Sequence, residues 1–573
     1  MRGRFAARVF GVAVVLTMVT VACSSSSSTG GGTSGSGTPH SGGEAVFGAE
    51  QWPQCLNPIT SCSFASWYFY TVQEQVMPQI MQLSVDNKFE ASPLLTGDAP
   101  SIDNGGVKTV GKGMTVTYHL NPDAVWDDGT PITSEDIDFT WKAIMNTTGT
   151  VSTSGYDQIT SIDASDPQTA VIHFKTVYVD WPDLFGGNLG YVIEKAAFPD
   201  ANPDKPDLSK DMATDVPFSG GPWILKSWDK SQAVLVRNPK YWGDKSLLDQ
   251  VTFVRRQNQS TEINSILTGE VDAIFPQPSN VSLLQQFSSN PNVKSVGGGS
   301  NYYEALHMNN ADPLFKDPKV REAMLYATDR QSVVNVIIKL NNPQATVLNC
   351  LGWWVPEDCA PDFQQFTYQP DKAMQILESD GYDCSGVANG GFCQKNGQDL
   401  TVSYLSTAGN DRRADTAALL KEKYKAAGIN LDVKFIDPTA LFSNNLPKGD
   451  FQLTEYALGG SPDPTVTTLY ACDQQPTAAN GYSGQNQDHW CNPQADKLMH
   501  ESDAELNPTK RTQEIHQIGA LVAQDFVGIP MYILPDVSAW RTDKIAGPIG
   551  VYNSSGYGLY YNMNKWYTVG SSS

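Results

Sequence analysis

The chain has 573 residues, of which 40% are hydrophobic and 10% aromatic, and its formal net charge is −22. A chain of this length is too long for one hydrophobic core, so several folded domains are expected. The acidic composition and the absence of a basic, Arg-rich aromatic segment exclude nucleic-acid binding through the overall field of the protein.

The N-terminal segment is typical of an exported lipoprotein. Three arginines within the first eight residues precede an apolar stretch, 9–22, which has the length of a signal-peptide core and is too short to span a bilayer. The stretch ends at Cys23, and the surrounding residues resemble a bacterial lipobox with Thr20 in place of the favoured leucine. We therefore predict a signal peptide over 1–22, lipidation of Cys23 and a flexible tether over 23–43. The alternative is a secreted protein with a stray cysteine near its cleavage site.

The cysteine count supports lipidation of Cys23. Of nine cysteines, eight fall into close pairs, each enclosing a short loop with glycine, proline or asparagine. An exported protein meets an oxidising compartment, so we expect four local disulfides, although eight cysteines permit about 105 pairings. The expected pairs are Cys55 with Cys62, Cys350 with Cys359, Cys384 with Cys393, and Cys472 with Cys491. A four-cysteine zinc site is the alternative, but no pair has the usual ligand spacing.

Hydrophobic periodicity predicts a mixed α/β body. In the first half we expect strands at 44–48 and 115–120, and a helix that starts after the capping pair Thr133 and Asp136. In the second half the expected helices are 371–380, 414–427, 494–504 and 508–525, and the expected strands are 400–405, 429–436 and 528–533. The strand–helix–strand order over 400–436 predicts parallel pairing.

Four motifs, taken in order, resemble the family 5 extracellular solute-binding proteins, which are oligopeptide- and dipeptide-binding receptors of ABC importers. They are Trp126-x-Asp128-Gly129-x-Pro131-x-Thr133-x-Glu135-Asp136, the block GGPWIL…RNPKYWG over 220–243, LTGEVDA over 267–273, and DPKVREAM…YATDR over 317–330. The resemblance covers about residues 44 to 560. Local chemistry explains much of these motifs: Asp317 and Asp329 are predicted to cap helices, and Tyr241 with Trp242 to fill a core.

The resemblance implies an α/β fold, the type II periplasmic-binding-protein fold in its large three-domain, two-lobe version with a ligand cleft. On this basis lobe I is discontinuous and comprises 44–66, 213–303 and 533–567. The accessory domain II covers 67–212, and lobe II, which is domain III, covers 304–532.

The resemblance also indicates which residues face the cleft. The candidate aromatic residues are Trp52, Trp67, Tyr68, Tyr302, Tyr303, Trp353, Trp354 and Tyr456, and the alternative for each is core packing. In peptide-binding relatives the segment equivalent to 455–464 binds the peptide backbone, which adds Gly459, Gly460, Ser461 and Asp463.

The same segment departs from the family pattern. In those relatives an aspartate before the (D/E)P step pairs with the α-ammonium of the ligand, whereas Gly460 occupies this position here. A buried ammonium without a partner is costly. Therefore either Asp463 or Glu455 takes this role, or the ligand is not a peptide with a free amine.

No motif indicates catalysis. The glycine-rich stretch 106–113 lacks the Ser or Thr that would hold magnesium, and neither Gly-x-Ser-x-Gly nor His-Glu-x-x-His occurs. We predict no catalytic residue, metal or cofactor. We expect a monomeric receptor, lipid-anchored on the extracytoplasmic face of the bacterial plasma membrane, that passes an oligopeptide to an ABC permease with its ATPases. The alternatives are a receptor for a non-peptide solute (an oligosaccharide, metal chelate or opine-like compound), a secreted hydrolase, and a surface protein without a transport role.

Overall fold

The computed structural model describes residues 38–49, 51–63, 68–84, 88–187, 190–275, 281–340, 342, 344–352, 358–459, 466–550 and 559–570. Within these ranges no helix combines the length and the apolar character needed to cross a membrane. The residues at the end of the predicted tether already contact the body, because the Gly42 amide donates to the Leu247 carbonyl at 2.8 Å and the Gly43 amide to the Asp249 carboxylate at 3.1 Å.

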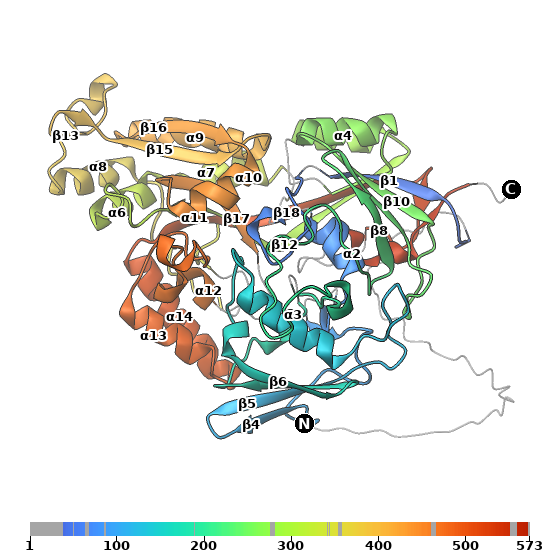
Figure 1. The fold of residues 1–573 in the computed structure, drawn as a ribbon. Coiled ribbons are helices and arrows are strands. Elements are labelled where there is room, and N and C mark those ends of the chain that lie inside the picture. The colour runs from blue at the N-terminus through green and yellow to red at the C-terminus, as the bar shows by residue number, and fades with distance from the viewer. Residues whose placement is uncertain are drawn as a thin grey trace, which may run out of the picture.

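One ten-stranded mixed sheet extends through the upper half of the molecule (Figure 1). Its strand order is β16-β15-β17-β12-β18-β11-β1-β10-β9-β8. The bounds are β1 Glu44–Ala49, β8 Trp223–Trp228, β9 Gln232–Arg237, β10 Gln250–Arg255, β11 Ala273–Ile274, β12 Val293–Met308, β15 Thr401–Thr407, β16 Asn430–Ile436, β17 Leu453–Gly459 and β18 Gly528–Arg541.

The long antiparallel strands β12 and β18 belong to both halves of this sheet. Their pairing runs from Val293 opposite Arg541 to Gly299 opposite Pro535, and resumes with Tyr303 opposite Ile533 after a register shift. We call the part of the sheet from β11 to β8 the first lobe, and the part from β16 to β17 the second lobe; each has its own large apolar core. The pairing of β18 with β12 continues from the second lobe toward the first. Strand β18 therefore extends to Arg541, whereas the predicted strand ended at 533.

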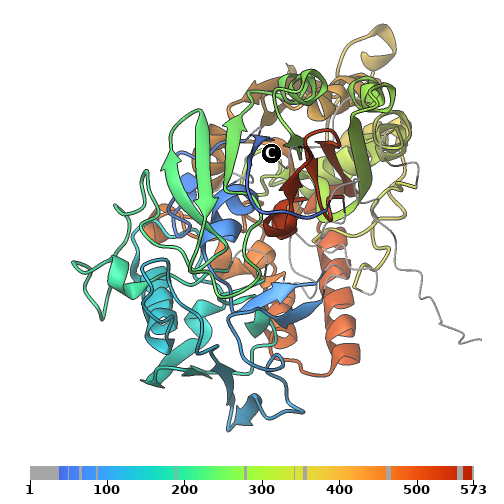
Figure 2. The same ribbon diagram turned by 90° about the vertical axis from the view of Figure 1, so that its right-hand side faces the viewer.

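A separate layer lies below the first lobe in Figure 1 and is seen from another side in Figure 2. It consists of a four-stranded sheet, β4-β5-β7-β6, and helix α3 (Ser134–Asn146). The strands are β4 Val107–Val110, β5 Gly113–His119, β6 Ile159–Asp166 and β7 Thr169–Phe174. The predicted cap of α3 is confirmed, since the Thr133 amide donates to the Asp136 carboxylate at 2.8 Å within a capping box.

Glu194 lies beside this helix and should make the stability of the layer depend on pH. Its side chain is buried and accepts from the Thr130 hydroxyl at 3.3 Å. Burial, and then the carboxylate of Asp128, raise the pKa of Glu194 from 4.5 to about 7. The protonated form therefore favours folding, and this contribution is complete below the unfolded pKa and is lost as the pH rises through the folded value.

We expect the melting temperature of the wild type to fall, relative to that of Glu194→Gln, between about pH 5 and pH 8. Thermal unfolding of both proteins across this range measures the difference. The exposed Glu378, in α8 (Pro370–Ser379), provides the control variant Glu378→Gln. Parallel curves for wild type and Glu194→Gln would contradict the prediction.

The second lobe confirms the predicted α/β order. Strands β15 and β16 pair in parallel on either side of helix α9 in sequence, and the Asp317 and Asp329 side chains cap their helices. Helix α9 (Asp411–Ala426) starts three residues before the predicted start because the Asn410 side chain accepts from the Arg413 amide and so caps it there. The other long helices are α6 Pro318–Ala327, α13 Pro493–Ser502 and α14 Pro508–Gln524. All four expected disulfides are formed.

Candidate ligand-binding site

A pocket of about 240 Å³, which we call the interlobe pocket, has walls from the N-terminal part of the chain and from the second lobe. One wall comes from Ser61 and from residues 149–151, which follow α3. The other comes from the second lobe, and it consists of Phe442, Ser443, Pro447, Lys448, Tyr456, Ala457, Leu458, Gly481, Tyr482, Gly484, Gln485 and Gln487. The lining thus combines aromatic and amide side chains, as in sites that replace the water shell of a solute.

Tyr302 and Gly459 form one edge of the contact between the lobes. They lie opposite each other in the β12–β17 ladder, and a Cβ on Gly459 would lie 2.3 Å from Cε1 of Tyr302. The Tyr302 ring therefore occupies the space above a residue without a side chain. From there its hydroxyl hydrogen-bonds the hydroxyl of Tyr70 at 2.7 Å, and Tyr70 comes from the turn Phe69–Gln73 near the first lobe.

Tyr456 joins the pocket to the core of the second lobe. Its ring is 4% exposed, stacks on His307 with the ring centroids 3.9 Å apart, and contacts Phe442 edge-on at 5.8 Å. Its hydroxyl donates to Oε1 of Gln487 at 3.4 Å. The aromatic wall is thus held in place by core packing, and Tyr303 is fully buried in the same lobe.

Two of the aromatic candidates belong to the core of the first lobe. The Trp52 indole donates to the Asp229 carbonyl at 2.8 Å, and the Tyr68 hydroxyl donates to the Leu56 carbonyl at 2.5 Å. Neither residue lines the interlobe pocket formed by the described residues. The candidates Cys23, Trp67, Trp353, Trp354, Gly460, Ser461 and Asp463 lie outside the described residues, so their roles remain predictions.

Glu455 is turned away from this pocket and is fully buried. Its carboxylate accepts a hydrogen bond from the Tyr404 hydroxyl and lies 3.8 Å from Nη1 of Arg412. Successive residues of a strand point to opposite faces of the sheet, so the Glu455 and Tyr456 side chains lie on opposite faces of β17. Glu455 and Asp463 were the two acids considered as partners for a ligand ammonium. Glu455 instead contacts Tyr404 and Arg412 inside the second lobe.

Glu304 completes this buried charge cluster. Its two carboxylate oxygens pair with Arg412 and Arg413, each at 2.8 Å, and all three side chains are at most 4% exposed. Burial raises the pKa of Glu304, but the two guanidinium groups outweigh it and hold the pKa below its ordinary value. The cluster links β12, β17 and α9, and so positions the strands that carry Tyr302, Tyr456 and Gly459.

The layer with α3 also contacts the second lobe directly. Asp180 and Arg511 form an ion pair at 2.6 Å, with side chains 1% and 7% exposed. Nearby, the Val179 amide donates to the Asp503 carbonyl at 2.9 Å. The two sides of the pocket are therefore closed on each other in this structure.

Asp180 and Arg511 were not among the predicted residues, because they are 331 residues apart and neither stands in a motif. Four further residues were also not predicted, namely Tyr70, Phe442, Lys448 and Gln487. Tyr70 alone had a usable signal, since it ends the aromatic run Trp67-Tyr68-Phe69-Tyr70 of which the first two residues were candidates.

Comparison with known proteins gives this geometry a family. A model described as the middle part of the bacterial extracellular solute-binding proteins, family 5, matches residues 104–480. The oligopeptide-binding protein AppA of Bacillus subtilis is 24% identical, with 99% of each chain covered.

Solved structures match over nearly the whole chain. The EDTA-binding protein EppA superposes with a TM-score of 0.79 and 20% identity, covering 95% of this chain and all of its own. Bacillus subtilis AppA in complex with a nonapeptide superposes with a TM-score of 0.77 and 20% identity, covering 93% of this chain and all of its own. NikZ from Campylobacter jejuni in complex with Ni(L-His) superposes with a TM-score of 0.75 and 18% identity, covering 91% of this chain and 99% of its own. The predicted fold class, a type II periplasmic-binding-protein fold in its large form, is confirmed.

The family model spans well over half of the sequence, and the predicted resemblance is therefore confirmed. The chain belongs to family 5 of the bacterial extracellular solute-binding proteins.

Proposed function

We propose that this protein is the solute-binding receptor of an ABC import system and that its ligand is an oligopeptide. The observation that carries the proposal is the pocket with one wall from Ser61 and residues 149–151 and the other wall from the second lobe. Separation of these walls about the register shift would open the pocket, and closure would bury the ligand. AppA, which is similar over almost the whole chain, is named for binding oligopeptides and holds a nonapeptide.

The remaining parts of the chain fit this role. The signal peptide 1–22, lipidated Cys23 and tether 23–43 hold the receptor on the extracytoplasmic face of the membrane. There it works as a monomer and hands the ligand unchanged to permease and ATPase subunits. Lobe I comprises 44–66, 213–303 and 533–567, domain II covers 67–212, and lobe II covers 304–532. Lipid attachment is measured by mass spectrometry of the mature N-terminal peptide.

A non-peptide ligand is the second candidate, and it is favoured by the electrostatics of the pocket. Gly460 supplies no carboxylate, and Glu455 is committed to Tyr404 and Arg412. The structural neighbours EppA and NikZ bind EDTA and Ni(L-His), respectively.

Tryptophan fluorescence during titration of the purified full-length protein distinguishes these candidates. The probes are a peptide library, the same peptides with acetylated N-termini, EDTA and nickel–histidine. We expect saturable binding of peptides, with acetylated and free forms binding within about threefold of each other because no described acid faces the pocket to pair with an ammonium. Recovery of intact peptide by mass spectrometry is expected. Cleaved peptide would support a hydrolase instead, and binding of a chelate alone would replace the peptide with the second candidate.

A further inference from the structure

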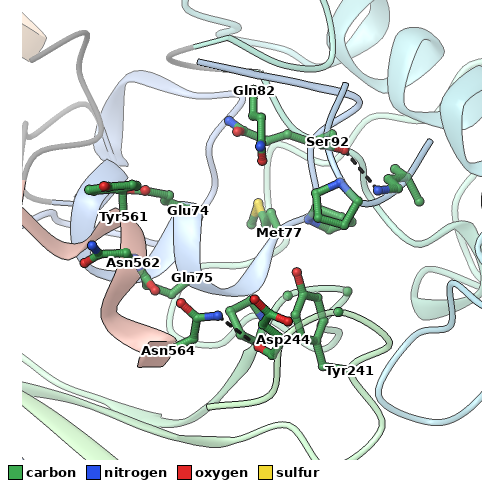
Figure 3. Close-up of a pocket in the computed structure, with 18 of the residues that line it drawn as sticks. Glu74, Gln75, Met77, Gln82, Ser92, Tyr241, Asp244, Tyr561, Asn562 and Asn564 are labelled. Carbon is green, nitrogen blue, oxygen red and sulfur yellow. Dashed lines mark hydrogen bonds between the residues drawn. The ribbon is translucent and has the colours of Figure 1, made fainter. Parts of the chain in front are cut away.

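A larger pocket, of about 630 Å³, lies elsewhere and shares no lining residue with the interlobe pocket (Figure 3). Its walls come from α2 (Glu74–Val76), the hairpin of β2 (Met81–Leu83) and β3 (Phe89–Ala91), the loop 241–244 and the C-terminal turn Leu559–Lys565. Its volume is in the range of small-molecule sites. Tyr241 and Trp242, which were predicted to fill a core, are half-buried and line this pocket, and Trp242 also packs against the core of the first lobe.

The charged groups of the wall are mainly acidic. Glu74, Glu90 and Asp244 supply carboxylates, and Lys565 supplies the ammonium group among the lining residues. The Lys565 ammonium lies 3.4 Å from Asp244, so that pair neutralises itself. Glu74 and Glu90 remain as the acidic groups of the wall without a lysine or arginine partner among its lining residues.

The amide and indole side chains of the wall already donate hydrogen bonds to the protein. Gln75 donates to the carbonyls of Tyr70 and Tyr560, both at 3.2 Å. Gln82 donates to Glu90 at 2.8 Å. Asn564 donates to the Asp244 carbonyl at 2.9 Å (Figure 3). Gln79, Trp242 and Asn562 donate to backbone carbonyls in the same way. The pocket is therefore rich in acceptors and suited to a ligand that brings donors.

Glu74 is the acceptor that most needs such a ligand. Its Oε2 is buried and has no hydrogen-bond partner among the described residues. In Figure 3 its side chain lies beside the ring of Tyr561, at the edge of the pocket. Burial raises the pKa of Glu74 well above its ordinary value, which is the cost of a carboxylate without a counter-ion.

Aromatic rings complete the site. The Tyr241 and Trp242 rings adjoin with their centroids 4.9 Å apart, and together with Tyr561 they line the pocket. Aromatic faces attract organic cations, and the Glu74 carboxylate beside Tyr561 (Figure 3) adds an ionic partner. We propose that this pocket binds a small organic cation, with an ammonium or guanidinium head paired to Glu74 and an apolar stem between the aromatic rings. The site goes beyond solute capture between the lobes and does not depend on it.

Calorimetric titration of the full-length protein with butylammonium and agmatine at constant ionic strength tests the proposal. The uncharged isostere 1-butanol is the ligand control. We expect both cations to bind at one site and 1-butanol not to bind. Glu74→Gln keeps the shape of the side chain but cannot ionise to pair with a cation, and we expect it to weaken cation binding by at least about tenfold.

Matched measurements separate this site from the interlobe pocket. Glu378→Gln, which removes an exposed carboxylate elsewhere, should leave cation binding unchanged. If Glu74→Gln does not fold, Tyr561→Leu replaces it, and it should weaken binding severalfold through loss of a ring face. The proposal is overturned if the wild type binds neither cation, if the folded variant binds them equally well, or if a saturating oligopeptide displaces them.

Discussion

The substitution Glu304→Gln is expected to lower the free energy of unfolding by about 3 kcal/mol or more, because it leaves Arg412 and Arg413 buried without their carboxylate. Both guanidinium groups lie 2.8 Å from Glu304 and are at most 4% exposed, so water cannot replace the lost partner. Urea unfolding of the wild type and the variant, followed by tryptophan fluorescence, measures the difference.

An exposed ion pair in the same lobe provides the matched control. Lys434 and Asp432 lie 2.9 Å apart with side chains 60% and 49% exposed, and Asp432→Asn should change the free energy of unfolding by less than about 1 kcal/mol. Equal effects of the two substitutions would mean that burial of the Glu304 cluster does not matter to stability.

The substitution Gly459→Ala is expected to weaken binding of the tightest peptide from the fluorescence titration by about tenfold. The added methyl group would lie 2.3 Å from Cε1 of Tyr302, so the ring must move. Its 2.7 Å hydrogen bond to Tyr70 joins the two sides in the closed molecule, and a hydrogen bond of this kind contributes about 1 kcal/mol. Loss of a contact made on closure lowers the affinity because it lowers the population of the closed state.

Gly386→Ala is the control for this substitution. A Cβ at Gly386 would meet no atom within 4 Å, and the residue lies in the disulfide loop between Cys384 and Cys393. The peptide affinity of Gly386→Ala should equal that of the wild type. If Gly459→Ala also binds like the wild type, Tyr302 does not take part in closure.

Local chemistry allowed much of the fold to be predicted. Thr133 with Asp136 and the aspartates Asp317 and Asp329 cap helices through contacts within a few residues, and such contacts are visible in the sequence. The parallel pairing of β15 and β16 follows from the helix between them. The passage of β12 and β18 through both lobes could not be predicted, because it depends on the pairing of strands far apart in the chain.

The site was harder to predict than the fold, for a physical reason. An aromatic residue that stabilises a core and one that lines a pocket have the same local sequence signal, so Trp52 and Tyr68 could not be separated from Tyr456. The orientation of Glu455 depends on Arg412, a residue that only the tertiary fold brings near it.

Native mass spectrometry of the full-length protein, purified under gentle conditions from its own host, tests most directly whether the molecule captures a solute between its lobes. We expect a noncovalent mass excess above that of the ligand-free chain, lost on unfolding and recovered as an intact peptide or other small solute. The mass of the bare chain, with no excess and no gain on incubation with the peptide library, would contradict it.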